Sequence, residues 1–264
     1  MEYYINLLFL DIETVPMVKD FELLDERTKH LFIKKLGHKI VEIPNQEQIV
    51  EIAGIRCTRN MSYDEKLNII WKENAALYAE FSRVACVSMG LLSETADGLN
   101  LKLHSIINRN ESTVLSELAV VLDKIPNYSL VGHNIKDFDA PFLTRRYLAN
   151  RIKLPAILNI GSKKPWELTW KDTMEIWAAG QFKYKCSLDL LCNTLGVDSP
   201  KGEMDGSKVA EIFYRDVKSD ELAFDVEQEA FKKITDYCEG DVRADAECYL
   251  VLVGSERKIV STSH

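Results

Sequence analysis

An apolar run that stops at two acidic residues is the feature of this sequence that most restricts its fold. Residues 7–10 read Leu-Leu-Phe-Leu, and Asp11 and Glu13 follow with one residue between them. Four consecutive apolar residues fit a strand buried on both faces of a sheet, and alternation along that strand turns Asp11 and Glu13 to the same side. Paired carboxylates repel, so such a pair usually shares a cation or takes up a proton. A strand end that frays into a polar loop is the alternative, and this short motif alone leaves both open.

The composition is that of an ordinary globular chain. Its 264 residues are 46% apolar and 28% charged, which suits one large domain with a well-buried core. No run approaches the roughly 20 apolar residues that cross a bilayer, and the N-terminus lacks the basic region of a secretory signal. The six cysteines stand singly, without zinc-type spacing, which indicates reduced and mostly buried thiols. We therefore expect a cytoplasmic protein with no membrane partner.

The net charge restricts the nature of any nucleic-acid partner. With 33 basic and 41 acidic residues, the chain carries a formal charge of 33 − 41 = −8. This argues against a broad basic face for duplex binding. It does not exclude a nuclease, because acidic metal ligands contribute negative charge and divalent ions can contact phosphate in place of a basic patch.

The order of predicted elements is that of an α/β fold. Helical spacing over residues 19–36 leads into a stretch without a clear pattern, and a second helical pattern follows near 65–81. We treat about 17–80 as an insertion or lid within a single domain of residues 1–264. The turn Asp97-Gly98 joins two apolar runs and predicts a hairpin. The remaining predicted elements are a strand at 128–132, a strand or helix start at 170–177, and helices at 112–125, 138–150, 187–195, 208–214 and 227–254. This order predicts a mixed sheet with a central parallel first strand, an antiparallel hairpin and flanking helices, and a site at the carboxyl ends of the central strands.

Polar residues also follow the strand predicted at 128–132. Gly132 ends that strand, a polar turn follows, and a helix is expected to begin at Phe138. Asp137 suits the N-cap of this helix, which is the interpretation we favour, and Asp139 in the first turn would be stabilised by the helix dipole. Either carboxylate could instead lie beside the first pair. Asn134 could position a bound partner or serve only the turn.

The last predicted helix carries a phenol and a carboxylate on an otherwise apolar face. Tyr237 and Asp241 are four residues apart and therefore share one side of the helix. A buried carboxylate needs partners, because a lone buried charge is strongly unfavourable. Tyr237 alone would serve as an ordinary core tyrosine. Asp245, one turn further, is expected to reach solvent or to pair with an arginine.

Together these segments resemble the three exonuclease motifs of the DEDD superfamily of 3′-5′ exonucleases, in its tyrosine-bearing branch. The matching residues are Asp11-Ile12-Glu13, Asn134-x-x-x-Phe138-Asp139 and Tyr237-x-x-x-Asp241. The segment 132–143 is most similar to the second motif of the proofreading exonuclease domain of family-B DNA polymerases, and this similarity selects Asp139 over Asp137. A chain of 264 residues has no room for polymerase palm and fingers, so it resembles that domain as a stand-alone protein.

The resemblance implies a ribonuclease H-like fold and a metal-dependent 3′-5′ exonuclease acting on single-stranded DNA ends. The implied metal ligands are Asp11, Glu13, Asp139 and Asp241, which would hold two Mg²⁺ or Mn²⁺ ions. Tyr237 would join these four as a catalytic residue by orienting the attacking water. Thr14, Asn134 and Phe138 would bind the terminal nucleotides. The alternatives are a 3′-5′ exoribonuclease with the same site and a non-catalytic nucleic-acid-binding protein on the same fold; no polymerase or repair partner is identified.

Basic and aromatic residues alternate between the second and third motifs. They are Lys163, Lys164, Lys183 and Lys185 with Trp166, Trp170, Phe182 and Tyr184. Such a mixture suits an edge that binds a single strand. An ordinary solvated loop is the competing interpretation, and the favoured one.

Overall fold

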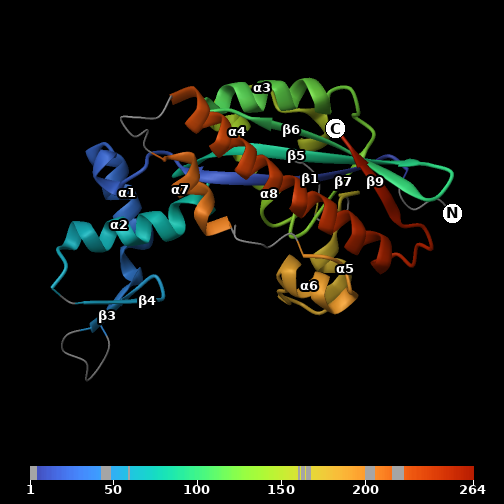
Figure 1. Cartoon of the computed structure of the whole chain (residues 1–264). Coiled ribbons are helices and arrows are strands. Elements are labelled where there is room, and N and C mark those ends of the chain that lie inside the picture. The colour runs from blue at the N-terminus through green and yellow to red at the C-terminus, as the bar shows by residue number, and fades with distance from the viewer. Residues whose placement is uncertain are drawn as a thin grey trace. The chain divides into compact units, whose positions relative to one another are not determined.

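The computed structural model describes residues 5–42, 49–58, 60–159, 161, 164, 168–199, 206–215 and 223–264. The chain, which Figure 1 colours by residue number, divides into two compact units. The first comprises Met1–Glu13, Val84–Gly206 and Val217–His264, and the second comprises Thr14–Arg83 and Ser207–Asp216. The segment 17–80, expected to be an insertion or lid, falls within the second unit.

The first unit is built on a six-stranded mixed sheet with the order β8-β7-β1-β5-β6-β9. The strands are β1 (Leu7–Pro16), β5 (Ser82–Glu94), β6 (Leu99–Ile107), β7 (Ser129–Gly132), β8 (Lys171–Asp172) and β9 (Ile259–Ser263). β1 pairs in parallel with β7, as β7 does with β8, whereas β5 and β6 form the predicted antiparallel hairpin. The predicted α/β class, with a ribonuclease H-like mixed sheet and a central first strand, is therefore confirmed. β9, which pairs in parallel with β6, was not predicted because its Ile-Val-Ser-Thr-Ser sequence is short and mostly polar.

The helices of this unit follow the predicted pattern closely. They are α3 (Glu111–Leu122), α4 (Asp139–Ala149), α5 (Thr173–Ala178), α6 (Leu188–Leu195) and α8 (Ala223–Leu252), with a short 3-10 helix at Ala156–Leu158; another, at Gly206–Lys208, begins at the boundary with the second unit. The Ser187 hydroxyl caps α6 by accepting from the Leu190 amide, and Gly196 ends it in the left-handed region at φ 69°, as expected. The segment predicted as either strand or helix is both, since the two-residue β8 runs directly into α5.

The N-cap role expected for Asp137 is wrong. α4 begins at Asp139, one residue later than predicted, and its N-cap residue Phe138 makes no side-chain capping bond. Asp137 instead accepts a hydrogen bond from Lys185 Nζ at 2.9 Å. The turn after β7 is one residue longer than the sequence suggested, which moves Asp137 out of capping position.

One face of the sheet packs against α8, which runs along it in Figure 1. The shared core is formed by Leu7, Phe9, Leu99, Leu101, Leu103, Val131, Val242, Ala246, Tyr249 and Leu250. At Gly90 in β5, an added Cβ would lie 2.9 Å from Val242 Cγ1, so glycine lets the helix approach closely there. Because side chains alternate along β1, Asp11 and Glu13 turn to the same face as Leu7 and Phe9, toward α8.

Helices α3 and α4 are tied together by a buried ion pair. Glu111, 7% exposed, accepts from Arg146 Nε at 2.8 Å and Nη2 at 2.6 Å, and also from the Asn150 side chain and the Val84 amide. The Tyr147 hydroxyl donates to the Leu115 carbonyl at 2.7 Å. These bonds fix α4, whose first residue is Asp139.

The second unit has its own core around Trp71. Its elements are α1 (Glu26–Leu36), α2 (Tyr63–Asn74), α7 (Val209–Phe213), an antiparallel sheet of β2 (Ile40–Glu42), β3 (Ile49–Ile52) and β4 (Ile55–Thr58), and 3-10 helices at Phe21–Leu23, Gly37–Lys39 and Ala75–Leu77. The rings of Phe32 and Trp71 pack edge to face with centroids 5.1 Å apart. A capping box of Ser62 and Glu65 begins α2. The helical spacing at 19–36 and near 65–81 anticipated α1 and α2, but the three short strands between them were missed.

Two further expectations concern cysteines and membranes. All six cysteines are free thiols, and all but Cys57 are buried. Among the residues that the structure describes, no helix has both the length and the hydrophobicity needed to cross a bilayer.

Candidate functional site

The carboxylates of β1 meet a cysteine of α8. Ligand atoms of Asp11, Glu13 and Cys238 all lie within 4.8 Å of one another. The Cys238 Sγ is 3.2 Å from Asp11 Oδ2 and 3.6 Å from the Asp11 carbonyl oxygen, so its thiol can donate to that residue. Sequence reasoning missed this role of Cys238, because a cysteine on the apolar stripe of a helix normally indicates a core thiol. Its position directly after Tyr237 was the available signal.

The turn after β7 brings Asp139 beside the end of β1. An added Cβ at Gly132 would lie 2.9 Å from the Leu10 carbonyl oxygen, so only glycine permits this close approach. Asp139 is 4% exposed, and its Oδ1 accepts from the Ile12 amide at 3.3 Å. Since Ile12 separates the two acidic residues of β1, Asp139 is held next to both.

Asp172 holds the same turn from the other side. Its Oδ1 accepts from the Asn134 amide at 3.0 Å and its Oδ2 from the Lys136 amide at 3.1 Å, while Oδ1 also caps α5 at Met174. These bonds stabilise Asn134 at φ 64°, a left-handed conformation that asparagine tolerates. The Asn134 Oδ1 accepts from Lys185 Nζ at 2.9 Å. Asp172, which sequence reasoning did not single out, thus shapes the second motif.

Phe138 and Thr14 were predicted to bind nucleotides. The Phe138 ring packs on Phe142 with centroids 5.4 Å apart and remains partly exposed beside Asp139. The Thr14 hydroxyl donates to the Ala76 carbonyl at 2.7 Å, so its hydrogen is already used within the second unit.

The charge of Asp241 on α8 acts on the carboxyl groups of Asp11, Glu13 and Asp139. Burial, then the charges of Asp139, Glu13 and Asp241, raise the pKa of Asp11 well above its ordinary value. Burial, followed by Asp241, does the same to the pKa of Glu13. For Asp139, burial outweighs its backbone hydrogen bonds and raises the pKa to about 7. Asp11, Glu13 and Asp139 therefore each resist ionisation beside the neighbouring carboxylates.

Tyr237 belongs to the same cluster. Burial first, then the charges of Asp241 and Glu13, raise the pKa of its hydroxyl far above the ordinary value, and a hydrogen bond with Asp241 adds to this. The phenol is consequently a hydrogen-bond donor throughout the physiological range.

Asp245 differs from its prediction. It was expected to reach solvent or pair with an arginine, but it is 4% exposed and its Oδ1 lies 2.5 Å from the Thr173 hydroxyl. Its Oδ2 has no hydrogen-bond partner among the described residues. The prediction failed because Asp245 continues the buried stripe of α8, where α5 covers it.

A line of hydrogen bonds fixes the proton on Asp245. His133 Nε2 is 2.7 Å from the Cys186 carbonyl, which only accepts, and His133 Nδ1 is 3.0 Å from the Thr173 hydroxyl. Burial lowers the pKa of His133, so its neutral ring donates from Nε2 and accepts at Nδ1. Thr173 then gives its one hydrogen to His133, and Asp245 must donate to Thr173. Burial accordingly raises the pKa of Asp245 to about 8.

We expect Asp245→Asn to stabilise the protein progressively as the pH rises from 5 to 8. The folded chain keeps a proton that the unfolded carboxyl loses near pH 4, so stability falls with pH in this window, by at most about 1.4 kcal/mol per pH unit. Asparagine removes this loss and can still donate to Thr173. Urea unfolding at several pH values measures the difference. Asp236→Asn, at the exposed ion pair with Lys232, is the control, and a parallel trend in both variants would contradict the assignment.

The predicted basic and aromatic edge is only partly present. Phe182 is 86% and Tyr184 37% exposed, but Trp170 is 4% exposed and does not belong to an edge. Lys163 and Trp166 lie outside the described residues.

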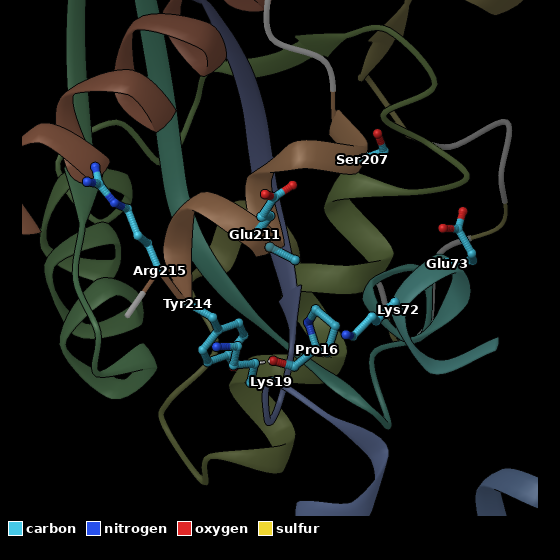
Figure 2. A pocket seen from close by; sticks show the side chains of 9 residues that line it. Pro16, Lys19, Lys72, Glu73, Ser207, Glu211, Tyr214 and Arg215 are labelled. Carbon is cyan, nitrogen blue, oxygen red and sulfur yellow. Dashed lines mark hydrogen bonds between the residues drawn. The ribbon is translucent and has the colours of Figure 1, made fainter. Parts of the chain in front are cut away.

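A separate cavity of about 530 Å³ lies in the second unit (Figure 2). Its lining combines cations with carboxylates, including Lys19, Lys72, Glu73, Glu211 and Arg215. The Tyr214 hydroxyl donates to the Pro16 carbonyl at its rim. None of the motif residues lines this cavity, so it is distinct from the acidic site.

The sequence also places the chain in a known protein family. Residues 76–257, more than half of the chain, match the family of predicted 3′-5′ exonucleases related to the exonuclease domain of PolB. The chain is therefore a member of that family. The matched range includes Asn134, Asp139, Tyr237 and Asp241, whereas Asp11 and Glu13 precede it.

Two individual proteins illustrate the similarity. The uncharacterized protein MJ0365 of Methanocaldococcus jannaschii is 26% identical over 162 residues, which cover 60% of this chain and 84% of that protein. The family B DNA polymerase of Pyrobaculum calidifontis is 15% identical with a TM-score of 0.48, over 93% of this chain. This chain spans 24% of the length of that polymerase.

Proposed function

We propose that the protein is a metal-dependent 3′-5′ exonuclease that hydrolyses the terminal phosphodiester bond of single-stranded DNA. The observation that supports this most is that burial and neighbouring negative charges, including that of Asp241, oppose the ionisation of Asp11, Glu13 and Asp139. Such a cluster is unfavourable unless protons or cations neutralise it. Because the chain belongs to a family of predicted exonucleases, we infer that such cations would serve phosphodiester hydrolysis.

The donor set fits Mg²⁺ or Mn²⁺. Carboxylate oxygens are hard ligands, which these ions prefer. Cys238 would not be a ligand, since burial raises the pKa of its thiol and keeps it protonated as a donor to Asp11. Divalent ions bound by these residues would stabilise charge on the phosphate and make the attacking water more acidic.

The remaining side chains would position the substrate and the water. The hydroxyl of Tyr237 keeps its proton, because its pKa is raised far above the ordinary value. It therefore cannot act as a general base and would instead orient the attacking water by hydrogen bonding. Asn134 and Phe138 would contact the terminal nucleotide by hydrogen bonding and packing. Thr14 can offer a nucleotide only its oxygen lone pairs, because its hydrogen is given to Ala76.

Tyr237→Phe is expected to slow hydrolysis by about a hundredfold, the lower end of what loss of one positioned hydrogen-bonding group costs in an active site. The pH dependence of the rate should keep its shape, because the phenol does not titrate in the working range. Single-turnover rates on a labelled oligonucleotide between pH 6 and 9 measure both. Loss of one limb of the profile in the variant would assign Tyr237 a proton-transfer role instead.

The proposed function is tested directly with a 5′-labelled single-stranded oligonucleotide. With Mg²⁺ or Mn²⁺ we expect progressive shortening from the 3′ end, and protection when that end carries phosphorothioate linkages. A matched RNA distinguishes the exoribonuclease alternative. Binding of both polymers without cleavage would favour the non-catalytic alternative.

A further inference from the structure

A cavity of about 570 Å³ lies beside the second motif, within the first unit. Its walls include Asn134, Lys136, Phe182, Lys183, Tyr184 and Lys185. The volume falls in the range of small-ligand sites. None of the four acidic residues assigned as metal ligands lines this cavity, so any role that it has in substrate binding is separate from metal binding.

The loop between α5 and α6 presents an aromatic surface at this cavity. Phe182 is 86% exposed and Tyr184 37% exposed. Ala179 and Lys183 adopt left-handed backbone conformations at φ 49° and 59°, which are unfavourable for residues other than glycine. A strained loop that exposes two aromatic rings does not gain stability from burying them, so their placement needs another explanation.

Among the described residues, two of the three lysines at this cavity are paired with carboxylates, and the third is not. Lys136 pairs with Glu175, and Lys185 Nζ donates at 2.9 Å to both Asn134 Oδ1 and Asp137 Oδ2. Lys183 forms no ion pair within the described part of the chain, and its Nζ lies 5.3 Å from the centroid of the Phe182 ring. One cation is thus left beside exposed aromatic rings, where a phosphate group could reach it.

We propose that this cavity, here called the Phe182 subsite, binds the single strand immediately upstream of the nucleotide to be removed. Unpaired bases stack on Phe182 and Tyr184, and Lys183 contacts the backbone phosphate. The inference rests on the proposed function, and it adds the position and the chemistry of strand binding. Lys185 couples the two regions, because it bonds to Asn134, the residue assigned to the terminal nucleotide.

This chemistry selects an unpaired strand. Every base offers a face for stacking, so an aromatic pair with one cation binds without strong sequence preference. Bases within a duplex are already stacked on their neighbours and cannot use the rings. A net charge of −8 is compatible with this mode, which needs local contacts and no basic face.

The experiment measures binding without turnover, in the Asp241→Asn background with Mg²⁺. A short DNA carries 2-aminopurine two or three nucleotides from its 3′ end, where stacking on an aromatic ring quenches its fluorescence. Phe182→Ala should reduce the quenching and raise Kd by about tenfold or more. Phe224→Ala, which removes an exposed ring from α8, is the matched control and should change neither.

A second variant tests the phosphate contact. Lys183→Ala should lower the slope of log Kd against log salt by about 0.7, the value for one phosphate on a single strand. Unchanged quenching and Kd in Phe182→Ala, or equal losses in Phe224→Ala, would overturn the subsite. Failure of the unmodified protein to shorten any oligonucleotide would instead reject the proposed function, so the two failures are distinguishable.

Discussion

Asp241→Asn is expected to lower the exonuclease rate by at least about a thousandfold, or about 4 kcal/mol of transition-state stabilisation, while making the metal-free protein more stable. After burial, the charge of Asp241 is the largest cause that raises the pKa of Glu13, and it also acts on Asp11 and Asp139. Asparagine removes this repulsion but keeps an oxygen that can accept from Tyr237. The opposite signs arise because the ligand set is optimised for a cation and not for folding.

Two measurements check this expectation together. Single-turnover rates on a 5′-labelled oligonucleotide give the activity, and thermal unfolding in EDTA gives the stability. Asp236→Asn is a matched control on the exposed side of α8, where Asp236 pairs with Lys232, and should keep the rate. Full activity of Asp241→Asn would reject Asp241 as a ligand, and a lowered melting temperature would show that the residue serves the fold.

Removal of divalent metal is expected to abolish hydrolysis, and its return should stabilise the fold in a pH-dependent way. A ligand at about 100 times its Kd adds about 2.7 kcal/mol of stability. The carboxylates must lose protons before they coordinate, and burial raises the pKa of Asp139 to about 7. Metal affinity should therefore increase between pH 6 and pH 8, by up to about tenfold per pH unit for each proton displaced.

Without metal, the stability of the protein should change with pH in the opposite direction. The folded chain retains protons on these acids that the unfolded chain has lost, so the stability of the apo-protein should fall over the same pH range. Thermal unfolding with Mg²⁺ or Mn²⁺ titrated at pH 6, 7 and 8 separates the two effects. Melting temperatures that ignore the metal at every pH would contradict a cation site in this cluster.

The sequence predicted those parts of the site that depend on local periodicity. Alternation along β1 put Asp11 and Glu13 on one face, and the four-residue spacing put Tyr237 and Asp241 on one side of α8. Choosing Asp139 over Asp137 required the family resemblance, because the length of the turn after β7 could not be deduced from the residues. The catalytic and ligand roles of these residues stay predictions.

Long-range packing accounts for what could not be predicted. Cys238 and Asp245 look like a core thiol and a surface acid in isolation, and only the tertiary fold brings them to Asp11 and Thr173. The strands β2, β3 and β4 are too short to show alternation. The expectation of a lid at 17–80 remains a prediction, although the segment belongs to a compact unit with its own aromatic core around Trp71.

The geometry of the acidic cluster also depends on Gly90, a residue that is not one of its ligands. Its missing side chain leaves the gap into which Val242 fits, and Val242 is the neighbour of Asp241. Because β5 is the neighbour of β1 in the sheet, we expect the close approach of α8 at Gly90 to help keep Asp241 near the carboxylates of β1. A single methyl group at position 90 would oppose that close approach while leaving every ligand in the sequence unchanged.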